Sequence, residues 1–383
     1  MRYNRYMDYN ELAKQLHRQY RGKITTALRD KSELTRDKLS AYYSPGVGEI
    51  SRLIAEDPAT LPEYTWTNNL VAVISDGSAI LGLGNLGPKA AMPVMEGKAL
   101  LFKHFAGIDS VPIVLDVHTA DEIVAAVKAI APSFGAINLE DIAAPICFEV
   151  EERLKAELDI PVFHDDQHGT AIVTLAGLIN AAKVVGKNLT DCKVVTIGAG
   201  AAGTAIVKLL NLYGIKNITA VDSRGIISSE RTDLNSEKQA LLQFTSPVKG
   251  TSLEDALTGA DIFIGVSRGG LLTPEMVKTM AKDPIIFGLA NPVPEIMPDV
   301  AKAAGAAIIA TGRSDFANQV NNALAFPGIF RGALDNKVTK ITDEHKLAAA
   351  KTIAALVKNP TADEVIPSVF NPSLVGNVSA AIQ

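Results

Sequence analysis

Two pairs of acidic residues in the first half of the chain are the residues whose spacing points most directly to chemistry. Glu140 and Asp141 directly follow one short apolar segment, and Asp165 and Asp166 follow another after a single histidine. Short apolar segments are typical of buried strands, and ligands bind at the carboxyl ends of parallel strands. Four carboxylates at one sheet edge repel each other unless a cation or a proton joins them. Oxygen ligands in this number favour Mg²⁺ or Mn²⁺.

Two other interpretations of these residues stay open. Aspartates are common N-caps, so each pair could simply begin a helix, although two paired sets favour a cation. His164 and His168 have the spacing of the two histidines in a zinc-peptidase helix. Asp165 stands where that motif has glutamate, however, and an apolar strand rather than a helix is expected to end at His164. A zinc site is therefore the weaker prediction.

A glycine-rich turn in the second half of the chain has the arrangement of a dinucleotide-binding site. Its residues are Gly198, Ala199, Gly200, Ala201, Ala202 and Gly203. An apolar segment precedes the turn, a helical pattern follows it, and Asp222 closes the next apolar segment about 20 residues later, as in the dinucleotide fingerprint. Glycine lets the backbone approach a pyrophosphate, whose charge is bound by free N–H groups at the helix start. A glycine-rich packing turn is the alternative.

The residues after the second strand of this pattern bear on the choice of cofactor. Asp222 can accept a hydrogen bond from a ribose 2′-hydroxyl and repels a 2′-phosphate, which favours NAD. Arg224 lies close behind it and could accommodate that phosphate. We therefore expect NAD as the cofactor, with NADP as the alternative.

A second sequence with the same glycine spacing, residues 82–87, is a poor dinucleotide site. It follows an expected hairpin strand, and Pro88 and Pro93 interrupt the start of the next helix. His118, instead of an acidic residue, closes the later strand region. We interpret residues 82–87 as a flexible loop that lines a cleft, with packing in the core as the alternative.

The elements that must position these residues alternate along the chain. Residues 1–60 have a mainly helical pattern, and residues 70–81 predict a hairpin around an Asp-Gly turn. Short strands are then expected at 111–115, 136–139 and 160–163, and helices at 95–106, 120–131, 147–158 and 170–185. A second alternating series has strands at 193–197, 218–221, 262–266, 285–287 and 307–309. This alternation is typical of doubly wound parallel sheets.

The predicted fold is α/β with two domains and a cleft between them. A catalytic and metal-binding domain, with a parallel sheet and a helical N-terminus, covers residues 1–170. A Rossmann-type dinucleotide-binding domain covers residues 171–340. The segment 341–383 contains one helix that is too short to fold alone, so we expect it to pack back on the first domain.

The bulk composition excludes several classes of protein. The chain has 383 residues, of which 47% are hydrophobic and 21% are charged, as is typical of a globular protein. A net charge of −5 argues against nucleic acid as a partner. The sequence has neither a signal-peptide pattern nor an apolar run long enough to span a membrane. Cys147 and Cys192 lie in apolar surroundings, which indicates core residues in a reducing cytoplasm.

Lys98 and Tyr43 indicate a function only when they are considered together with the acidic pairs and the glycine-rich turn. Lys98 lies in an otherwise apolar helical pattern, where a lysine usually places its ammonium group at the surface. Tyr43 lies in an expected loop. Together with the acidic pairs and the glycine turn, however, they make the chain resemble the malic enzyme family over nearly its whole length. The resemblance rests on YSPGVG (43–48), ILGLGNLG (80–87), GKAL (97–100), ED (140–141), FHDDQHGTA (163–171), ANP (290–292) and NNALAFPG (321–328).

The resemblance implies a role for each of these residues. The implied ligands of a divalent metal ion, Mg²⁺ or Mn²⁺, are Glu140, Asp141 and Asp166. Lys98 would be the general base, oriented by Asp165, and Tyr43 would be the general acid. The implied contacts of the substrate are Lys98, Asn291 and one of the two neighbours Asn321 and Asn322. Asn291 would also lie near the nicotinamide.

The activity that the resemblance implies is oxidative decarboxylation of L-malate to pyruvate and CO₂, with reduction of NAD(P). Lys98, with a pKa lowered by burial and a nearby metal ion, would take the proton of the C2 hydroxyl, and Tyr43 would protonate C3. A metal-dependent oxaloacetate decarboxylase on the same scaffold is the main alternative. Malolactic conversion, for which the chain looks short, and a non-catalytic nucleotide sensor are two others. A homodimer or higher homo-oligomer is implied as well.

The residue that holds a substrate carboxylate is not evident. Longer members of the family have an arginine for this purpose after the strand that precedes the glycine loop. The matching stretch in this chain, residues 75–80, contains none. Arg313, Arg268 or a residue of a partner subunit could replace it.

Overall fold

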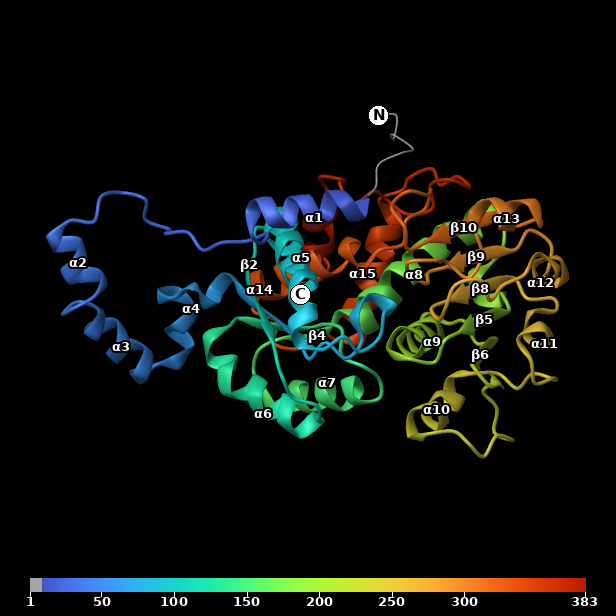
Figure 1. The fold of residues 1–383 in the computed structure, drawn as a ribbon, viewed down its shortest axis with the longest axis horizontal. Coiled ribbons are helices and arrows are strands. Elements are labelled where there is room, and N and C mark those ends of the chain that lie inside the picture. Colours follow the sequence, from blue (N-terminus) through green and yellow to red (C-terminus); the bar gives the residue numbers. More distant parts are fainter. Residues whose placement is uncertain (1–8) are drawn as a thin grey trace.

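Two parallel sheets form the framework of the chain, for which a computed structural model describes residues 9–383 (Figure 1). The first sheet has the strand order β2-β1-β3-β4. Its strands are β1 (Leu70–Ser75), β2 (Asp109–Val114), β3 (Ala136–Leu139) and β4 (Val162–His164). All neighbouring strands of this sheet are parallel, which matches the predicted architecture of the first domain.

The hairpin predicted for residues 70–81 is wrong. β1 pairs with β2 on one side and β3 on the other, so no edge is left for a returning strand. After β1 the chain turns at Asp76, whose Oδ1 accepts a hydrogen bond from the Ser78 backbone at 3.0 Å. A 3₁₀ helix, Ile80–Gly82, and an exposed loop follow in place of a strand. The Asp-Gly pair therefore makes a turn without a hairpin.

Helices cover both faces of the first sheet. Val71 and Val73 of β1 share one hydrophobic cluster with Phe102 of α5 (Pro88–Ala106). The alternate residues Ala72 and Ile74 share a second cluster with α6 (Ala120–Ile130) and α7 (Ile146–Glu157). Both faces of β1 are therefore buried, which explains its continuous run of apolar residues.

The second sheet has the order β10-β9-β8-β5-β6-β7, in which only the short β7 is antiparallel. Its strands are β5 (Val194–Ile197), β6 (Ile218–Asp222), β7 (Gly225–Ile226), β8 (Ile262–Gly265), β9 (Ile285–Gly288) and β10 (Ile308–Thr311). Its helices are α9 (Ala201–Tyr213), α10 (Ser236–Leu241), α11 (Leu253–Leu257), α12 (Pro274–Thr279) and α13 (Pro298–Ala303). The order around β5, from which the chain continues first to β6 and later to β8, is that of a Rossmann-type domain.

Four helices outside the two sheets pack between them or against the first domain. They are α8 (Asp165–Val184), α14 (Phe326–Asp335), α15 (Asp343–Ala355) and α16 (Leu374–Ala380). The Phe102 ring of α5 lies 4.8 Å from that of Phe326 and 5.1 Å from that of Phe330, between ring centroids. Asn180 of α8 donates a hydrogen bond of 2.8 Å to the Ala354 carbonyl of α15. The C-terminal part of the chain thus packs on both α8 and the first domain.

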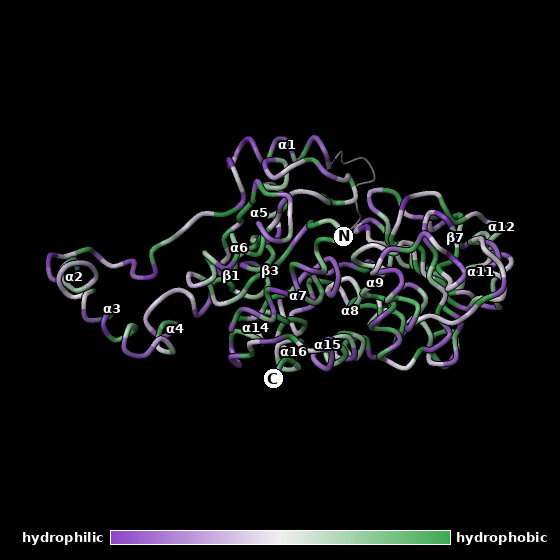
Figure 2. The backbone as a smooth tube through the Cα atoms, turned by 90° about the horizontal axis from the view of Figure 1, so that it is seen from below, coloured by the Kyte–Doolittle hydropathy of each residue, from purple (hydrophilic) through white to green (hydrophobic). Residues whose placement is uncertain are grey.

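From residue 9 on, the N-terminal part is mainly helical, as predicted, but it does not fold into the core; the prediction for residues 1–8 lies outside the described residues. Its helices are α1 (Tyr9–Tyr20), α2 (Arg36–Tyr42), α3 (Val47–Glu56) and α4 (Leu61–Tyr64). α1 lies beside α5, whereas α2 and α3 project away from the rest of the molecule in both views (Figures 1 and 2). We call residues 24–66 the N-terminal arm. None of the helices in residues 9–383 is both long enough and apolar enough to cross a membrane.

Candidate active site

A buried cluster of carboxylates lies at the carboxyl ends of β3 and β4. Glu140 and Asp141 directly follow β3, and Asp165 and Asp166 form the start of α8 directly after β4. Because β3 and β4 are parallel neighbours, both pairs emerge at the same edge of the sheet. The backbone N–H of Asp141 donates a hydrogen bond of 2.7 Å to Asp166 Oδ2, which joins the two pairs.

Lys98 reaches this cluster from the middle of α5. Its Nζ lies 2.5 Å from Asp165 Oδ2 and 2.8 Å from Glu140 Oε1. The same ammonium group lies 4.4 Å from the centroid of the Phe326 ring. With only 6% of its side chain exposed, Lys98 does not place its charge at the surface, as lysines in apolar helices usually do. The structure thus brings Lys98 and Asp165 into direct contact.

The cluster carries more negative charge than Lys98 can neutralise. Burial alone would lower the pKa of Lys98, but attraction by Asp165 and by the acids beside it raises that pKa above its ordinary value. The lowered lysine pKa expected from the sequence requires a bound metal ion as well as burial, and burial acts in the expected direction. Burial raises the pKa of Asp141 to about 8, with repulsion from Asp166 adding to the effect. Burial also raises the pKa of Asp166 itself to about 6.

Unpartnered oxygens indicate that the cluster suits a cation. Asp141 Oδ2 and Asp165 Oδ1 are both buried without a hydrogen-bond partner, and a buried carboxylate oxygen in this state is costly. Asp141 also has a φ of 53°, a left-handed conformation that is uncommon outside glycine and frequent at functional sites. The Leu81 N–H holds this residue in place by donating a hydrogen bond of 3.3 Å to its Oδ1.

The donor chemistry of the cluster fits Mg²⁺ or Mn²⁺, since all candidate donors are acidic oxygens. Within residues 9–383, however, no three potential ligand side chains already surround a common point. Glu140 is one reason, because both of its carboxylate oxygens already have partners. Oε1 faces Lys98, and Oε2 accepts a hydrogen bond of 3.0 Å from the Asn138 amide. The zinc alternative has no support in the geometry. His164 ends β4, and the ring of His168 contacts Glu151 instead.

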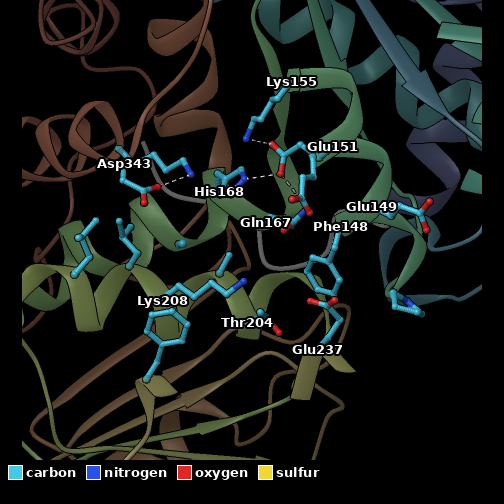
Figure 3. A pocket seen from close by; sticks show the side chains of 18 of the residues that line it. Phe148, Glu149, Glu151, Lys155, Gln167, His168, Thr204, Lys208, Glu237 and Asp343 are labelled. Atoms are coloured by element: carbon cyan, nitrogen blue, oxygen red, sulfur yellow. Dashed lines mark hydrogen bonds and ion pairs between the residues drawn. The ribbon is translucent and has the colours of Figure 1, made fainter. Parts of the chain in front are cut away.

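Glu151 of α7 is a buried acid that the sequence does not single out. Its carboxylate accepts a hydrogen bond of 3.0 Å from the His164 backbone and lies 2.8 Å from His168 Nε2 and 2.6 Å from Lys155 Nζ. Figure 3 shows Glu151 between Lys155 and His168, beside a cavity of about 770 Å³. These contacts fix the junction of β4 and α8, and thereby the first turn of α8 that carries Asp165. A lone glutamate in an amphipathic helix gives no signal of this role.

The glycine turn after β5 has the conformation that dinucleotide binding requires. Gly198 has a φ of 107°, and a side chain there would meet the Val266 carbonyl at 2.6 Å. A Cβ at Gly203 would lie 1.6 Å from the Gly198 carbonyl, so only glycine allows α9 to start this close to β5. At Gly200, by contrast, a Cβ would meet nothing within 4 Å. This open position lies at the N-terminus of α9, where the backbone N–H groups can face a pyrophosphate.

Asp222 ends β6, as the dinucleotide fingerprint predicts, but it is already ion-paired. Arg231 binds it through two hydrogen bonds of 2.8 and 3.2 Å, and Lys238 Nζ lies 2.6 Å from its Oδ2. Arg224, considered from the sequence as a partner for a phosphate, instead pairs with Asp233 at 2.8 Å. The basic side chains that bind the Asp222 carboxylate are therefore those of Arg231 and Lys238. They lie 9 and 16 positions further along the chain.

The loop at residues 82–87 faces the second domain. It is exposed, which excludes the alternative of a buried packing turn. A Cβ on Gly82 would lie 3.0 Å from the carbonyl oxygen of Asn291, so this loop lines the junction between the two domains. Arg313 lies at the same junction, with a hydrogen bond of 3.2 Å to the Pro292 carbonyl and an ion pair of 2.7 Å with Asp315. Arg268 lies in an exposed loop after β8.

The two neighbouring asparagines differ in their surroundings. The Oδ1 of Asn321 accepts a hydrogen bond of 2.9 Å from the Ala323 N–H and so caps a 3₁₀ helix. The Cβ of Asn322 lies 3.1 Å from where a side chain on Gly169 would begin, one turn of α8 beyond Asp165. Asn322 therefore lies near the carboxylate cluster, whereas the side-chain oxygen of Asn321 is occupied by its hydrogen bond with the backbone.

Tyr43 is the one predicted catalytic residue that the structure does not bring to the cluster. It follows α2 in the N-terminal arm, and 71% of it is exposed. α2 and α3, which flank it, lie outside the body of the molecule (Figure 1). Within one chain, the general acid implied by the resemblance is therefore separated from Lys98.

The glycine turn of one domain and the lysine–carboxylate cluster of the other define a two-domain α/β oxidoreductase that uses a dinucleotide. Comparison with protein families assigns both parts. The malic enzyme N-terminal domain matches residues 21–155, and the malic enzyme NAD-binding domain matches residues 167–382. The chain therefore belongs to the malic enzyme family, whose members are NAD(P)-dependent oxidoreductases.

Individual relatives match this chain over more than nine tenths of its length. A bifunctional malic/malolactic enzyme of Bacillus subtilis is 54% identical over 98% of this chain and 92% of its own length. An NAD-dependent malic enzyme of Geobacillus stearothermophilus is 57% identical over 91% of this chain and 73% of its own length. The crystal structure of an NAD-dependent malic enzyme from Thermotoga maritima superposes with a TM-score of 0.94, at 50% identity over 97% of this chain and 98% of that one.

Proposed function

We propose that this chain catalyses the oxidative decarboxylation of L-malate to pyruvate and CO₂, with NAD as the preferred oxidant and Mg²⁺ or Mn²⁺ as the metal ion. The observation that carries the proposal is the buried contact of Lys98 with Asp165 and Glu140, across the domain junction from a dinucleotide turn. Membership of the malic enzyme family supports the same reaction.

Lys98 acts as the general base in this proposal. Its Nζ takes the proton of the C2 hydroxyl of malate while C2 is oxidised. A base must be neutral, whereas the surrounding acids raise the pKa of Lys98. Glu140, Asp141 and Asp166 would hold the metal ion, which, when bound, supplies positive charge that polarises the substrate and stabilises the electrons released on decarboxylation. Neutralising these acids also removes the attraction that keeps Lys98 protonated.

The other residues position the substrate and the cofactor. Asp165 holds the Lys98 side chain at 2.5 Å and prevents it from turning away from the substrate. Asn322 is the better placed of the two asparagines for a substrate carboxylate, because Asn321 uses its oxygen as a cap. Asn291, at the domain junction, serves the nicotinamide and substrate side of the cleft. Tyr43 donates the proton that C3 requires after CO₂ has left.

Arg313 is the better candidate for the missing carboxylate clamp. It lies at the Asn291-Pro292 segment, whereas Arg268 lies in an exposed loop. A guanidinium group binds a carboxylate through two parallel hydrogen bonds, and Arg313 already binds Asp315 in this way. Exchange of Asp315 for a substrate carboxylate would leave the geometry of the arginine unchanged.

NAD is the expected cofactor because Asp222 adds negative charge where NADP carries a phosphate. NAD-dependent and NADP-dependent relatives both match this chain, at 57% and 47% identity, so we base the choice of cofactor on the local charges. Arg231 and Lys238 attract a phosphate, but both are compensated by Asp222, and Arg231 also by Asp233. The remaining positive charge at this site is therefore small.

The test is a spectrophotometric assay at 340 nm with purified protein, L-malate and Mn²⁺, run with NAD and with NADP. Reduction that EDTA abolishes, that Lys98→Ala loses and that pyruvate formation matches supports the proposal. Steady consumption of oxaloacetate without any reduction of either cofactor would support an oxaloacetate decarboxylase and overturn it.

Malolactic conversion is the second candidate, since a relative of similar length carries that activity in its name. The expectation that the chain is too short for it is wrong, because the Bacillus relative is matched over 92% of its own length. Formation of lactate from malate with catalytic amounts of NAD would reveal it.

We further propose that the protein is a cytoplasmic homo-oligomer with domain limits at 1–170, 171–340 and 341–383. Its two cysteines are free and buried, which is compatible with a reducing compartment.

A further inference from the structure

Glu295 is a buried acid of the second domain that the proposed mechanism does not use. It is 0% exposed, and among residues 9–383 no lysine, arginine or histidine forms an ion pair with it. A carboxylate that is buried without a cation is costly unless hydrogen bonds compensate for the water that it has lost. The contacts of Glu295 therefore indicate what this charge does for the fold and for the cleft.

The carboxylate of Glu295 bridges the carboxyl ends of β8 and β9, which are parallel neighbours in the second sheet (Figure 1). Its Oε1 accepts a hydrogen bond of 2.9 Å from the N–H of Ser267, two residues after β8. Its Oε2 accepts one of 3.1 Å from the N–H of Ala290, two residues after β9. Burial raises the pKa of Glu295, and these two donors oppose burial by lowering it. Since an N–H group faces each oxygen, the arrangement favours the ionised form.

The two strands end in glycines, which leave room for this carboxylate. A Cβ on Gly265, the last residue of β8, would lie 2.3 Å from the Cδ of Glu295. A Cβ on Gly288, the last residue of β9, would lie 3.5 Å from its Oε2. The backbone beside the carboxylate is fixed as well, because the Glu295 carbonyl accepts a hydrogen bond of 3.0 Å from the Leu272 N–H. The buried charge is thus held in place from several sides.

The strand order places the nicotinamide half of a dinucleotide at the edge that carries Glu295. In a Rossmann-type sheet the two nucleotides lie over opposite halves of the sheet, and the pyrophosphate lies at the turn after the first strand. Here that turn follows β5, and Asp222 at the end of β6 is expected to bind the ribose of the adenosine half. The nicotinamide half therefore belongs over β8 and β9, on the other side of β5.

The hydrogen bond to Ala290 also fixes the segment that faces the first domain. Asn291 follows Ala290 directly, and its carbonyl oxygen lies 3.0 Å from where a side chain on Gly82 would begin. The side-chain nitrogen of Asn291 lies 2.8 Å from the equivalent point at Gly312, directly after β10. Glu295 therefore supports, through a single hydrogen bond, a segment that lines the junction between the two domains.

We propose that Glu295 makes the second domain favour the oxidised dinucleotide, by holding an uncompensated negative charge at the strand ends that receive the nicotinamide ring. This ring is positively charged in NAD and neutral in NADH, so a fixed carboxylate attracts only the oxidised form. Water screens the attraction little, because Glu295 is fully buried. Glu295 acts through its charge and through the loop that it holds, and so it is a positioning residue. The inference rests on the proposed use of NAD.

Three ligands separate the charge of Glu295 from a merely structural role. The dissociation constants of NAD, NADH and ADP-ribose, which lacks the nicotinamide ring, are measured by calorimetry with Mn²⁺ and without malate. In Glu295→Gln we expect the ratio of the constant for NAD to that for NADH to rise about fivefold or more, while that for ADP-ribose changes less than about twofold. Equal changes for NAD and NADH, or no change at all, would overturn the proposal.

The matched control is Glu275→Gln, which removes an exposed acid on α12 of the same domain. It should leave all three dissociation constants nearly unchanged, because water screens its charge. Glu295→Asp keeps the negative charge but shortens the side chain. Any loosening of the Ala290 loop in this variant should weaken NAD and NADH alike, so their ratio should stay within about twofold of the wild-type ratio. A rise in that ratio as large as in Glu295→Gln would contradict the proposal.

The wild-type protein gives a result that does not depend on whether a variant folds. It is expected to bind NAD at least as tightly as NADH in the presence of Mn²⁺. Tighter binding of NADH by about tenfold or more would overturn the proposal. The expected binding pattern in a protein that does not oxidise malate would leave the role of Glu295 standing and reject the proposed function alone.

Discussion

Lys98 Nζ lies 2.5 Å from Asp165 Oδ2, in an ion pair that is almost completely shielded from solvent and that joins α5 to the first turn of α8. The two residues are 67 positions apart in the sequence. A buried charge is costly unless it is paired, so each residue of this pair requires the other. The contact places a lysine at the carboxyl edge of the first sheet, where the acids that would hold a metal ion also lie.

Removing the charge of Asp165 should impair catalysis, while Glu140, 2.8 Å from Lys98 Nζ, still pairs the buried lysine in the folded protein. Asp165→Asn retains the shape of the side chain but loses the contact that orients Lys98. We expect kcat/KM for malate to fall by about 100-fold or more, the typical contribution of a positioned base. The matched control is Asp109→Asn, in which a half-buried aspartate of β2 loses its ion pair with the exposed Lys103 of α5, and kcat/KM should stay nearly unchanged. Equal losses in the two variants would contradict the role of Asp165.

Asp141 should contribute directly to metal affinity. Its Oδ2 is buried without a partner, and replacing the carboxylate by an amide removes one negative oxygen ligand. For Asp141→Asn we expect the dissociation constant of Mn²⁺, measured by electron paramagnetic resonance of the free ion, to rise about tenfold or more. Asp116→Asn, at an exposed position after β2 on the same sheet, is the control. An unchanged Mn²⁺ affinity in Asp141→Asn would remove this residue from the ligand set.

Substitution by alanine should have different effects on cofactor binding and on stability at two glycines of the dinucleotide turn. At Gly200 a Cβ meets nothing within 4 Å, so Gly200→Ala should fold normally but hinder the approach of the pyrophosphate. We expect its NAD dissociation constant to rise about tenfold while the melting temperature stays constant. At Gly203 a Cβ would lie 1.6 Å from the Gly198 carbonyl, so Gly203→Ala should lower the melting temperature as well. A large loss of stability in Gly200→Ala would show that its turn has no free space.

Asp222 should set the preference for NAD over NADP. Asp222→Ser leaves Arg231 and Lys238 without their shared carboxylate and removes its repulsion of a 2′-phosphate. We expect the ratio of kcat/KM for NADP to that for NAD to rise about tenfold, or roughly 1.4 kcal/mol. Addition of Lys238→Ala should reverse most of the gain. A ratio that does not move in Asp222→Ser would show that the ribose binds elsewhere.

The features predicted correctly from the sequence are those whose conformation or position in the fold is set by residues adjacent in the chain. The turn at 198–203 is one example, because strand, glycines and helix are contiguous and each glycine meets a local steric need. The acidic pairs are another, since a short apolar strand followed directly by two acids predicts a position at a sheet edge wherever that strand lies. The parallel architecture follows from the alternation of apolar strands and helices.

The tertiary structure alone decided what contacts these residues make. β1 became a central strand because β2 and β3 occupy both of its edges, which the Asp-Gly signal for a hairpin could not reveal. The charge of Lys98, the support of the α8 turn by Glu151 and the pairing of Asp222 with Lys238 all depend on residues that only packing brings together. Electrostatic energies depend on distance and burial, and neither quantity is encoded in local sequence. For the same reason, the sequence could not reveal that Tyr43, on the projecting N-terminal arm, lies apart from Lys98 within one chain.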